Sequence, residues 1–210
     1  MIWQEEGLSR EDVATLGHLH LETLPASLVT KLGFAYAESF YRYIARSKQE
    51  VLFIFRLDSR GPIAGACALS IAPATLERRL TVGSCLIPAL AVRPLVLLDC
   101  FLSRAEPPRS LAAIGRSLPS DLAGCPEVVA IFTARSVRGR GVGASLLGAV
   151  ESYLREKELS RYYVKTIDAP DNHAVQFYLD NGFLLRARYS KYRKVFQIFD
   201  KTISDVPPRL

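Results

Sequence analysis

The sequence lacks an uninterrupted apolar run long enough to cross a lipid bilayer. Its most apolar stretch, residues 85–101, is broken by Pro88, Arg93, Pro94 and Asp99, whereas a membrane-spanning helix needs about 20 consecutive apolar residues. The opening residues, M-I-W-Q-E-E-G, contain acidic side chains and no apolar core of a signal peptide. We therefore expect no membrane span and a cytoplasmic protein.

Cysteine and histidine are also scarce. The four cysteines, Cys67, Cys85, Cys100 and Cys125, are widely spaced and form no C-x-x-C pair, and the chain has three histidines. In a chain without a secretion signal this pattern favours reduced cysteines that act as small buried hydrophobes. We expect no bound metal.

What the sequence does contain is enough apolar material for a full core. The 210 residues are 49% hydrophobic and 23% charged, which is typical of one globular domain. The net charge of +6 favours an anionic ligand, because a positive field steers anions into a cleft. The basic residues are scattered and match no nucleic-acid-binding module, so we expect no nucleic-acid partner.

The most informative stretch begins at Val128 with V-V-A-I-F-T, which predicts a strand. A glycine-dense turn, R-G-R-G-V-G, follows at residues 138–143. Residues 144–159 then have apolar side chains at helical spacing, namely Leu146, Leu147, Val150 and Leu154. This order is typical of a phosphate site, because glycines let backbone N–H groups approach an anion and a helix N-terminus adds partial positive charge.

Two common phosphate loops are excluded. The Walker A motif needs a lysine after its last glycine, and the dinucleotide motif needs G-x-G-x-x-G, whereas Gly139, Gly141 and Gly143 are spaced two and two. The turn instead fits R-x-x-G-x-G, with Arg138 as the arginine. This pattern resembles the acetyl-CoA pyrophosphate loop of the GNAT superfamily of N-acetyltransferases. The alternative interpretation is a plain strand-to-helix turn with glycines for packing.

A second segment, residues 171–183, reads D-N-H-A-V-Q-F-Y-L-D-N-G-F. It is similar to the second GNAT signature, N-x-x-A-x-x-x-Y-x-x-x-G-F. The residues that match in register are Ala174, Tyr178, Gly182 and Phe183. The family's asparagine falls on Asp171, one place before Asn172. The resemblance implies an amide contact to the pantetheine arm, and we expect Asn172 to make it, with Asp171 as the alternative.

The resemblance implies how acetyl-CoA binds and reacts. Loop N–H groups hold the pyrophosphate, strand residues pair with pantetheine, and an N–H near Thr133 polarises the thioester carbonyl. A primary amine attacks directly, and Tyr178 is the acid that protonates the leaving thiolate; the alternative for Tyr178 is a core residue of an amphipathic helix. The expected acetyl-CoA ligands are Ile131, Phe132, Thr133, Arg138, Gly139, Arg140, Gly141, Val142, Gly143, Ala144, Asn172 and Tyr178.

The sequence does not identify a general base. Glu127 lies at the start of the central strand, and no carboxylate stands beside Thr133. The candidates are Glu22, His18, His20 and His173, each of which can equally be structural. An amine that arrives unprotonated, or that loses its proton to water, needs no dedicated base.

The predicted fold class is α/β, a GNAT-like mixed, mostly antiparallel twisted sheet flanked by helices, with a helical insertion before the central strand. Residues 1–210 form one domain, with the insertion at about 73–126 and a frayed tail at 204–210. Within the insertion we expect helical pieces at Leu86–Leu90, Leu95–Leu102 and Leu111–Leu118. The strands ending near Thr133 and beginning near Arg161 should lie parallel and splay apart.

The remaining elements follow from local patterns. Ser9-x-x-Asp12 predicts a capping box for a helix that ends at Pro25. A second helix is expected from Ser27 to about Ser47, with its inward side formed by Leu28, Leu32, Ala35, Phe40, Tyr43 and Ile44. Further predicted elements are a hairpin of Val51–Leu57 and Pro62–Ile71, a strand Tyr162–Ile167, a helix Ala174–Asp180 and a hairpin of Phe183–Ser190 and Tyr192–Phe199.

The predicted function is transfer of an acetyl group from acetyl-CoA to a primary amine of a small molecule such as an amino sugar. Leu21–Gly33 also resembles the opening of GNAT members that modify sugar amines of surface polysaccharides. The alternatives are a peptide or protein amine as acceptor, and a non-catalytic acyl-CoA-binding regulatory module. A homodimer is one possible oligomeric state.

Overall fold

Seven strands form one sheet in the order β1-β2-β3-β4-β5-β7-β6. The structure, a computed structural model, describes residues 2–4, 7–58, 61–83, 89, 118–191 and 194–203. The strands are β1 Ile2–Gln4, β2 Glu50–Arg56, β3 Ile63–Ser70, β4 Glu127–Thr133, β5 Arg161–Ile167, β6 Leu184–Lys191 and β7 Lys194–Thr202. Among these strands only β4 and β5 pair in parallel, so the predicted mixed, mostly antiparallel sheet is confirmed. The pairing of β1 with β2 was not predicted.

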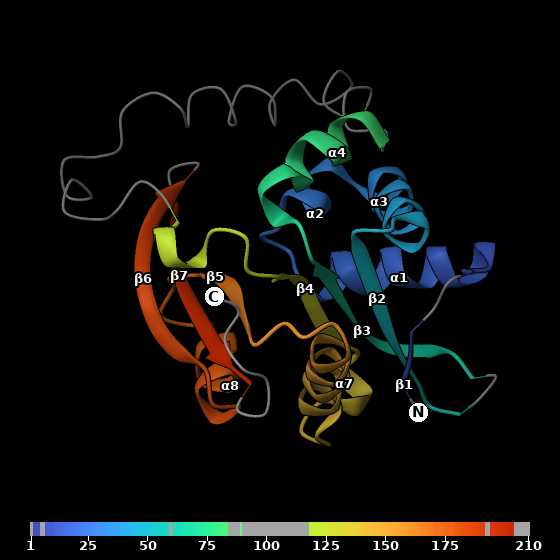
Figure 1. The fold of residues 1–210 in the computed structure, drawn as a ribbon. Helices are drawn as coiled ribbons and strands as arrows, with labels where there is room; N and C mark the ends of the chain where they lie inside the picture. Colours follow the sequence, from blue (N-terminus) through green and yellow to red (C-terminus); the bar gives the residue numbers. More distant parts are fainter. Residues whose placement is uncertain are drawn as a thin grey trace.

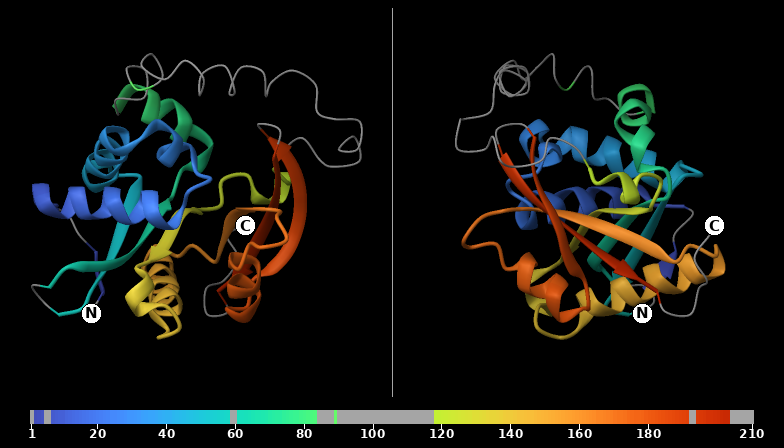
Figure 2. Two further views of the ribbon diagram at one scale, coloured as in Figure 1. Left: turned by 180° about the vertical axis from the view of Figure 1, so that it is seen from behind. Right: turned by 60° about the vertical axis from the view of Figure 1, so that its left-hand side comes forward.

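Helices cover both faces of the sheet (Figures 1 and 2). On one face lie α1 Arg10–Thr23, α2 Leu28–Leu32 and α3 Phe34–Arg46, whose buried side chains form one core with β2, β3 and β4. On the other face lie α7 Val142–Glu156 and α8 Ala174–Asp180, which form a second core with the strands. The predicted inward residues of α7, Leu146, Leu147, Val150 and Leu154, are all buried.

Local sequence signals set the ends of several elements. The Ser9 hydroxyl accepts the backbone N–H of Asp12 at 3.0 Å, and the Asp12 carboxylate accepts the Ser9 N–H at 3.3 Å, which is the predicted capping box. At the far end of α8, Gly182 adopts a φ of 80° directly after the last turn. The hairpin of β6 and β7 also forms as predicted.

The predicted single helix from Ser27 to Ser47 is wrong, because Gly33 divides it into α2 and α3. Gly33 has a φ of 88°, a conformation that ends one helix and starts the next along a new axis. The break changes which side chains face the core. Leu28 and Ala35 are exposed rather than inward, and the buried residues of α3 are Tyr36, Ala37, Phe40, Tyr41 and Ile44.

The central strands β4 and β5 diverge soon after they meet. Their parallel pairing joins Glu127 to Tyr163 and Val128 to Val164, although β4 continues to Thr133 and β5 to Ile167. Figure 1 shows the two strands leading to different parts of the molecule, β4 into α7 and β5 towards the β6–β7 hairpin. The predicted splaying of a parallel pair is therefore confirmed.

The segment between β3 and β4 is described only at its two ends. Its start contains a 3-10 turn, η1 Pro73–Thr75, and the helix α4 Leu76–Gly83, and its end contains the 3-10 turn η3 Ser120–Leu122. The predicted pieces Leu86–Leu90, Leu95–Leu102 and Leu111–Leu118 lie almost entirely outside the described residues, as do Cys85, Cys100 and the tail 204–210. The insertion and the single-domain boundaries stay predictions.

The described residues can be compared with what the composition predicts for cysteines, membrane spans and metal sites. Cys67 is a free, buried thiol and Cys125 a free, half-buried one. No helix in the described ranges is long and apolar enough to cross a membrane. Within those ranges no group of three or more histidine, cysteine, aspartate or glutamate side chains could hold a metal ion.

Candidate acetyl-CoA site

The glycine loop lies between the end of β4 and the start of α7. A short 3-10 turn, η4 Arg135–Val137, precedes it. Gly139 and Gly141 then adopt φ values of 72° and 76°, which a residue with a side chain rarely adopts. A Cβ atom added at either glycine would meet no atom within 4 Å. The loop therefore borders open space, into which a ligand can come close to the backbone.

The start of α7 presents unpaired donors to this space. Gly141 is the N-cap and no side chain caps the helix; the first helical bond runs from the N–H of Ser145 to the carbonyl of Gly141 at 2.9 Å. The N–H groups of the first turn, at Val142, Gly143 and Ala144, thus have no intrahelical acceptor. Donors of this kind, together with the helix dipole, suit a phosphate group.

Arginines surround the loop. Arg138 and Arg140 are exposed, and the Arg138 Nε donates to the carbonyl oxygen of Thr133 over 3.4 Å. Arg135 forms an ion pair with Glu22 at the end of α1, with 3.2 Å between Nε and Oε1. No sequence signal connects these last two residues, which are far apart in the chain. The ion pair therefore links the turn before the glycine loop to helix α1, which belongs to the helical layer on the other face of the sheet.

The end of β4 has one paired edge and one open edge. Ile131, Phe132 and Thr133 pair with Cys67, Ala66 and Gly65 of β3. Towards β5 the ladder stops at Val128, so from Val129 onward β4 has no partner in that strand. An extended ligand can use this edge, because its unmatched N–H and carbonyl groups require hydrogen-bond partners.

Tyr178 lies in an aromatic cluster beneath the sheet. Its ring centroid is 5.3 Å from that of Phe177, 5.4 Å from that of Phe183 and 5.9 Å from that of Phe199. The side chain is 5% exposed, and this burial raises the pKa of Tyr178 well above its usual range. The hydroxyl therefore stays protonated at neutral pH and can donate a hydrogen bond.

The Asn172 side chain links α8 to the end of β5. Its amide nitrogen donates to the hydroxyl of Thr166 at 2.7 Å and to the carbonyl of Ile167 at 2.5 Å, while its oxygen accepts the N–H of Ala174 at 3.1 Å. The side chain thereby holds the start of α8 against the end of β5. Asp171 is exposed. The pantetheine contact expected of Asn172 stays a prediction.

Glu127, at the start of β4, and the candidate base His20 are both buried and hydrogen-bonded. Glu127 accepts a hydrogen bond from the Tyr163 hydroxyl at 2.8 Å and forms an ion pair with Lys165 at 2.7 Å. His20 lies between the Tyr41 hydroxyl at 2.6 Å and the Ser27 hydroxyl at 2.8 Å. Burial lowers the pKa of His20 to about 4, so the ring is neutral at physiological pH.

The other candidate bases lie at the surface. Glu22 is engaged by Arg135, His18 stacks on Phe34 with 4.2 Å between ring centroids, and His173 is exposed at the start of α8. The geometry singles out no general base. The structure does bring together the glycine loop, the open edge of β4 and the helix that carries Tyr178, because Gly143 of α7 packs against Phe177 of α8.

Comparison with known proteins identifies this arrangement. Residues 100–183, which include the glycine loop and Tyr178, match the model of the acetyltransferase (GNAT) family. No protein of curated function matches the chain by sequence.

Solved acetyltransferase structures share the fold. An aminoglycoside 6'-N-acetyltransferase complexed with coenzyme A aligns with a TM-score of 0.61 at 10% identity, covering 100% of this chain and 99% of that one. Escherichia coli ribosomal-protein-S18-alanine N-acetyltransferase aligns with a TM-score of 0.56 at 12% identity, covering 100% and 97%. Arabidopsis thaliana NAA60 in complex with a bisubstrate analogue gives 0.58 at 14% identity, covering 99% and 100%.

At these identities the structural likeness shows the fold alone, and the family match is a likeness of residues 100–183. Members of the matched family use acetyl-CoA as co-substrate. The chain thus has the fold of solved acetyltransferases, and its residues 100–183 match the acetyltransferase (GNAT) family.

Proposed function

We propose that the protein transfers the acetyl group of acetyl-CoA to a primary amine of a small molecule, such as an amino sugar, by direct attack. The observation that carries this proposal is the glycine loop at Gly141, which opens beside the edge of β4 that β5 leaves unpaired. A phosphate seat and an open strand edge at one place suit a ligand with a pyrophosphate and an amide-containing arm.

We assign the binding roles from this geometry together with the resemblance to the family. The N–H groups at the start of α7 hold the pyrophosphate, with Gly139, Gly141 and Gly143 leaving room for it and Arg138 and Arg140 adding charge at the rim. Ile131, Phe132 and Thr133 pair with the pantetheine arm. An N–H near Thr133 donates to the thioester oxygen as negative charge develops there, which lowers the barrier by about 3 kcal/mol.

The chemical step needs no covalent intermediate. The amine nitrogen attacks the thioester carbonyl carbon, the C–N bond forms, and the C–S bond breaks. The proton that the amine loses ends on the sulfur, so the enzyme is unchanged after each turnover. A tyrosine is a weaker acid than a thiol, whose pKa is about 8.5, and burial raises the pKa of Tyr178 further. Tyr178 therefore stabilises the developing thiolate by donating a hydrogen bond and passes on its proton only as another proton replaces it.

The choice of a small amine rests on the sequence of Leu21–Gly33, which contains the end of α1 and the whole of α2. In the structure this segment contacts a residue that follows β4 and a residue of β7. Glu22 pairs with Arg135 before the glycine loop, and the carbonyl of Ala26 accepts a bond from Lys194 of β7 at 3.2 Å. We propose that side chains of this segment contact the acceptor.

The test is release of CoA from acetyl-CoA in the presence of two panels, one of amino sugars and one of peptides with free N-terminal amines. We expect release with amino sugars and its loss in Gly141→Asp. Turnover with peptides alone would favour the protein-acetylating alternative. Acetyl-CoA binding without release in either panel, in protein whose binding Gly141→Asp abolishes, would favour a regulatory module.

A further inference from the structure

A hollow lies between the first residues of α1 and the last turns of α3. Its cavity volume is about 480 Å³, and it is lined by Gly7, Leu8, Ser9, Arg10, Val13, Arg42, Ala45 and Arg46. None of these residues belongs to the glycine loop, β4 or α8. The hollow is therefore separate from the proposed acetyl-CoA site and lies in the helical layer on the other face of the sheet.

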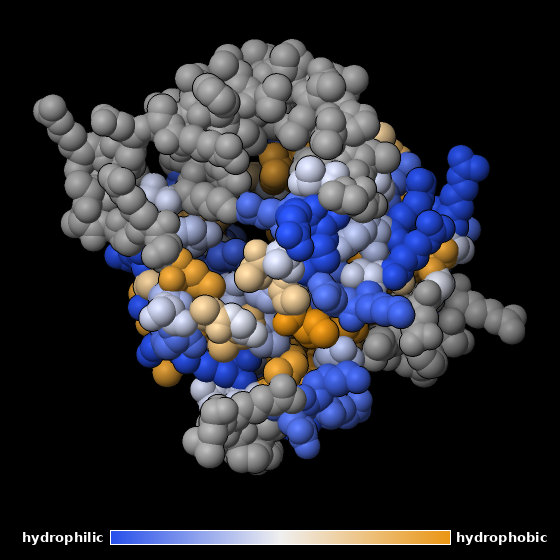
Figure 3. Space-filling model, turned by 45° about the horizontal axis from the view of Figure 1, so that its top comes forward, coloured by the Kyte–Doolittle hydropathy of each residue, from blue (hydrophilic) through white to orange (hydrophobic). Residues whose placement is uncertain are grey.

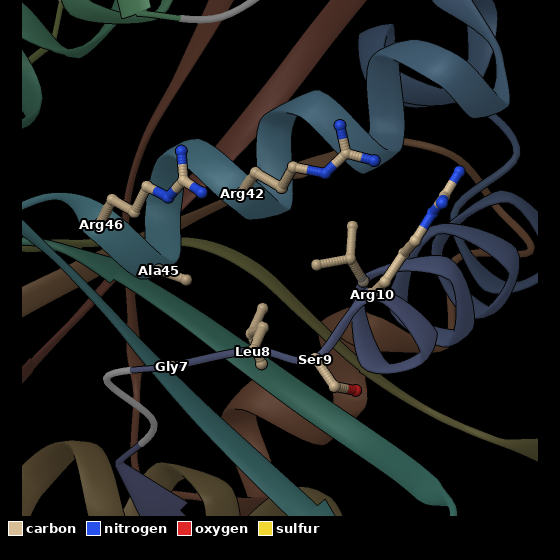
Figure 4. Close-up of a pocket in the computed structure, with 8 residues that line it drawn as sticks. Gly7, Leu8, Ser9, Arg10, Arg42, Ala45 and Arg46 are labelled. Carbon is tan, nitrogen blue, oxygen red and sulfur yellow. The ribbon is translucent and has the colours of Figure 1, made fainter.

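Three arginines from two helices stand at the rim of this hollow. In Figure 4 the guanidinium groups of Arg10, Arg42 and Arg46 all lie on one side of the segment Gly7–Ser9. Arg42 and Arg46 are one helical turn apart, so their side chains emerge from the same face of α3. Hydrophilic residues also project from the α1–α3 side of the surface, at the right of Figure 3.

The acidic groups near this rim are largely engaged elsewhere. Asp12 caps α1 through Ser9 and forms an ion pair with Arg56 at 2.9 Å. Glu38 pairs with Arg42, but only over 3.5 Å and at a solvent-exposed position, where such pairs contribute little. The structure records no acidic partner for Arg10 or Arg46 among the described residues. Cationic side chains that line one hollow attract an anion into it.

The rest of the lining is apolar. Leu8, Val13 and Ala45 line the hollow below the arginines, and Val13 is 2% exposed. A second hollow, of about 340 Å³, lies on the other side of Arg42 and Arg46 and is lined also by the polar side chains of Ser39, Tyr43 and Ser47. Guanidinium groups beside an apolar wall, in a cavity of ligand size, suit a small organic anion.

We propose that this hollow is a second ligand site, which binds a small molecule with a carboxylate or phosphate group independently of acetyl-CoA. Arg42 and Arg46 contact the anionic group from α3, and Arg10 contacts it from α1. The apolar lining receives the carbon skeleton.

The experiment uses protein saturated with CoA, so that the glycine loop cannot take up the probe. Citrate and inorganic phosphate are titrated separately at low ionic strength by calorimetry, which distinguishes a carboxylate site from a phosphate site. We expect one site for at least one probe, and an affinity at least tenfold weaker in Arg42→Ala/Arg46→Ala. Its CoA affinity and melting temperature should match those of the unmodified protein.

Arg155→Ala is the matched control, because Arg155 also forms an exposed pair one turn away, with Glu151 at 3.8 Å. It should bind both probes as the unmodified protein does. Gly141→Asp should keep the probe site after losing CoA. The proposal is overturned if CoA-saturated protein binds neither probe, or if the double variant and Arg155→Ala weaken probe binding equally.

Discussion

The glycine loop, residues 138–144, and the aromatic cluster of Phe177, Tyr178, Phe183 and Phe199 are neighbours built in opposite ways. The loop borders open space at Gly139 and Gly141, and its contribution to binding comes from the backbone. In the cluster Tyr178, Phe183 and Phe199 are buried and Phe177 is half-buried, and its contribution comes from one side-chain hydroxyl. The loop should therefore govern affinity for CoA, and the cluster should govern the rate of reaction.

The largest expected effect is on the loop. Gly141→Asp places a carboxylate where the pyrophosphate binds and a side chain at a positive φ, so CoA affinity should fall at least about 100-fold by calorimetry. Asparagine tolerates this φ and is uncharged. The CoA affinity of Gly141→Asn therefore separates the effect of the aspartate charge from the effect of a side chain at this backbone conformation. Gly148→Asp is the control, since Gly148 lies in the same helix with open space around it. Unchanged affinity in folded Gly141→Asp would remove the loop from the site.

The second effect is on the cluster. Tyr178→Phe keeps the ring contacts and removes the hydroxyl, so kcat should fall by a factor on the order of 10² while CoA affinity is retained. With an acyl donor that carries a better leaving thiol, the difference in kcat between Tyr178→Phe and the unmodified protein should be smaller. Because burial raises the pKa of Tyr178, Tyr178 should keep its proton at every pH below 10. The rate should therefore not fall in that range through formation of a tyrosinate. Tyr162→Phe, which removes a buried hydroxyl that donates to Glu151, controls for general damage, and equal rates in Tyr178→Phe and the unmodified protein would assign the role elsewhere.

The third prediction concerns the contact between the two regions. A Cβ atom at Gly143 would stand 2.9 Å from the Phe177 ring, so Gly143→Ala should cost about 1–3 kcal/mol of unfolding free energy. Denaturant titration measures the cost. Phe177→Leu should recover part of it in the double variant, whereas additive effects would show that the two residues do not couple.

The smallest expected effect is on the pH dependence of the free energy of unfolding, and it comes from His20, which lies outside both regions. Its pKa is about 4 in the folded protein and about 6.5 when unfolded. The unfolded chain therefore takes up a proton first as the pH falls, so this contribution is complete above pH 6.5 and is lost towards pH 4. Between pH 6.5 and 5.5 the loss should be about 1 kcal/mol. His20→Phe should flatten the pH dependence of unfolding and His173→Gln should not; equal slopes in both variants would contradict the assignment.

Features encoded within a few residues could be predicted from the sequence. The capping box at Ser9, the glycine loop and the N-x-x-A-x-x-x-Y register of α8 each depend on near neighbours. The break at Gly33 was missed because the apolar spacing on either side fits one continuous helix. The engagement of Asn172 by Thr166 and the burial of His20 under Tyr41 depend on tertiary contacts, which no local pattern contains.

The short pairing of β4 with β5 has a mechanical consequence. Only two residue pairs join the strands β1–β4 to the strands β5–β7 within the sheet, so this ladder is the natural joint of the molecule. An arm of acetyl-CoA bound between β4 and β5 would link the two groups of strands and restrict their motion relative to one another. We expect hydrogen exchange at the amides of Ile131 and Thr133 to slow on ligand binding, and the two halves of the sheet to open less independently of one another.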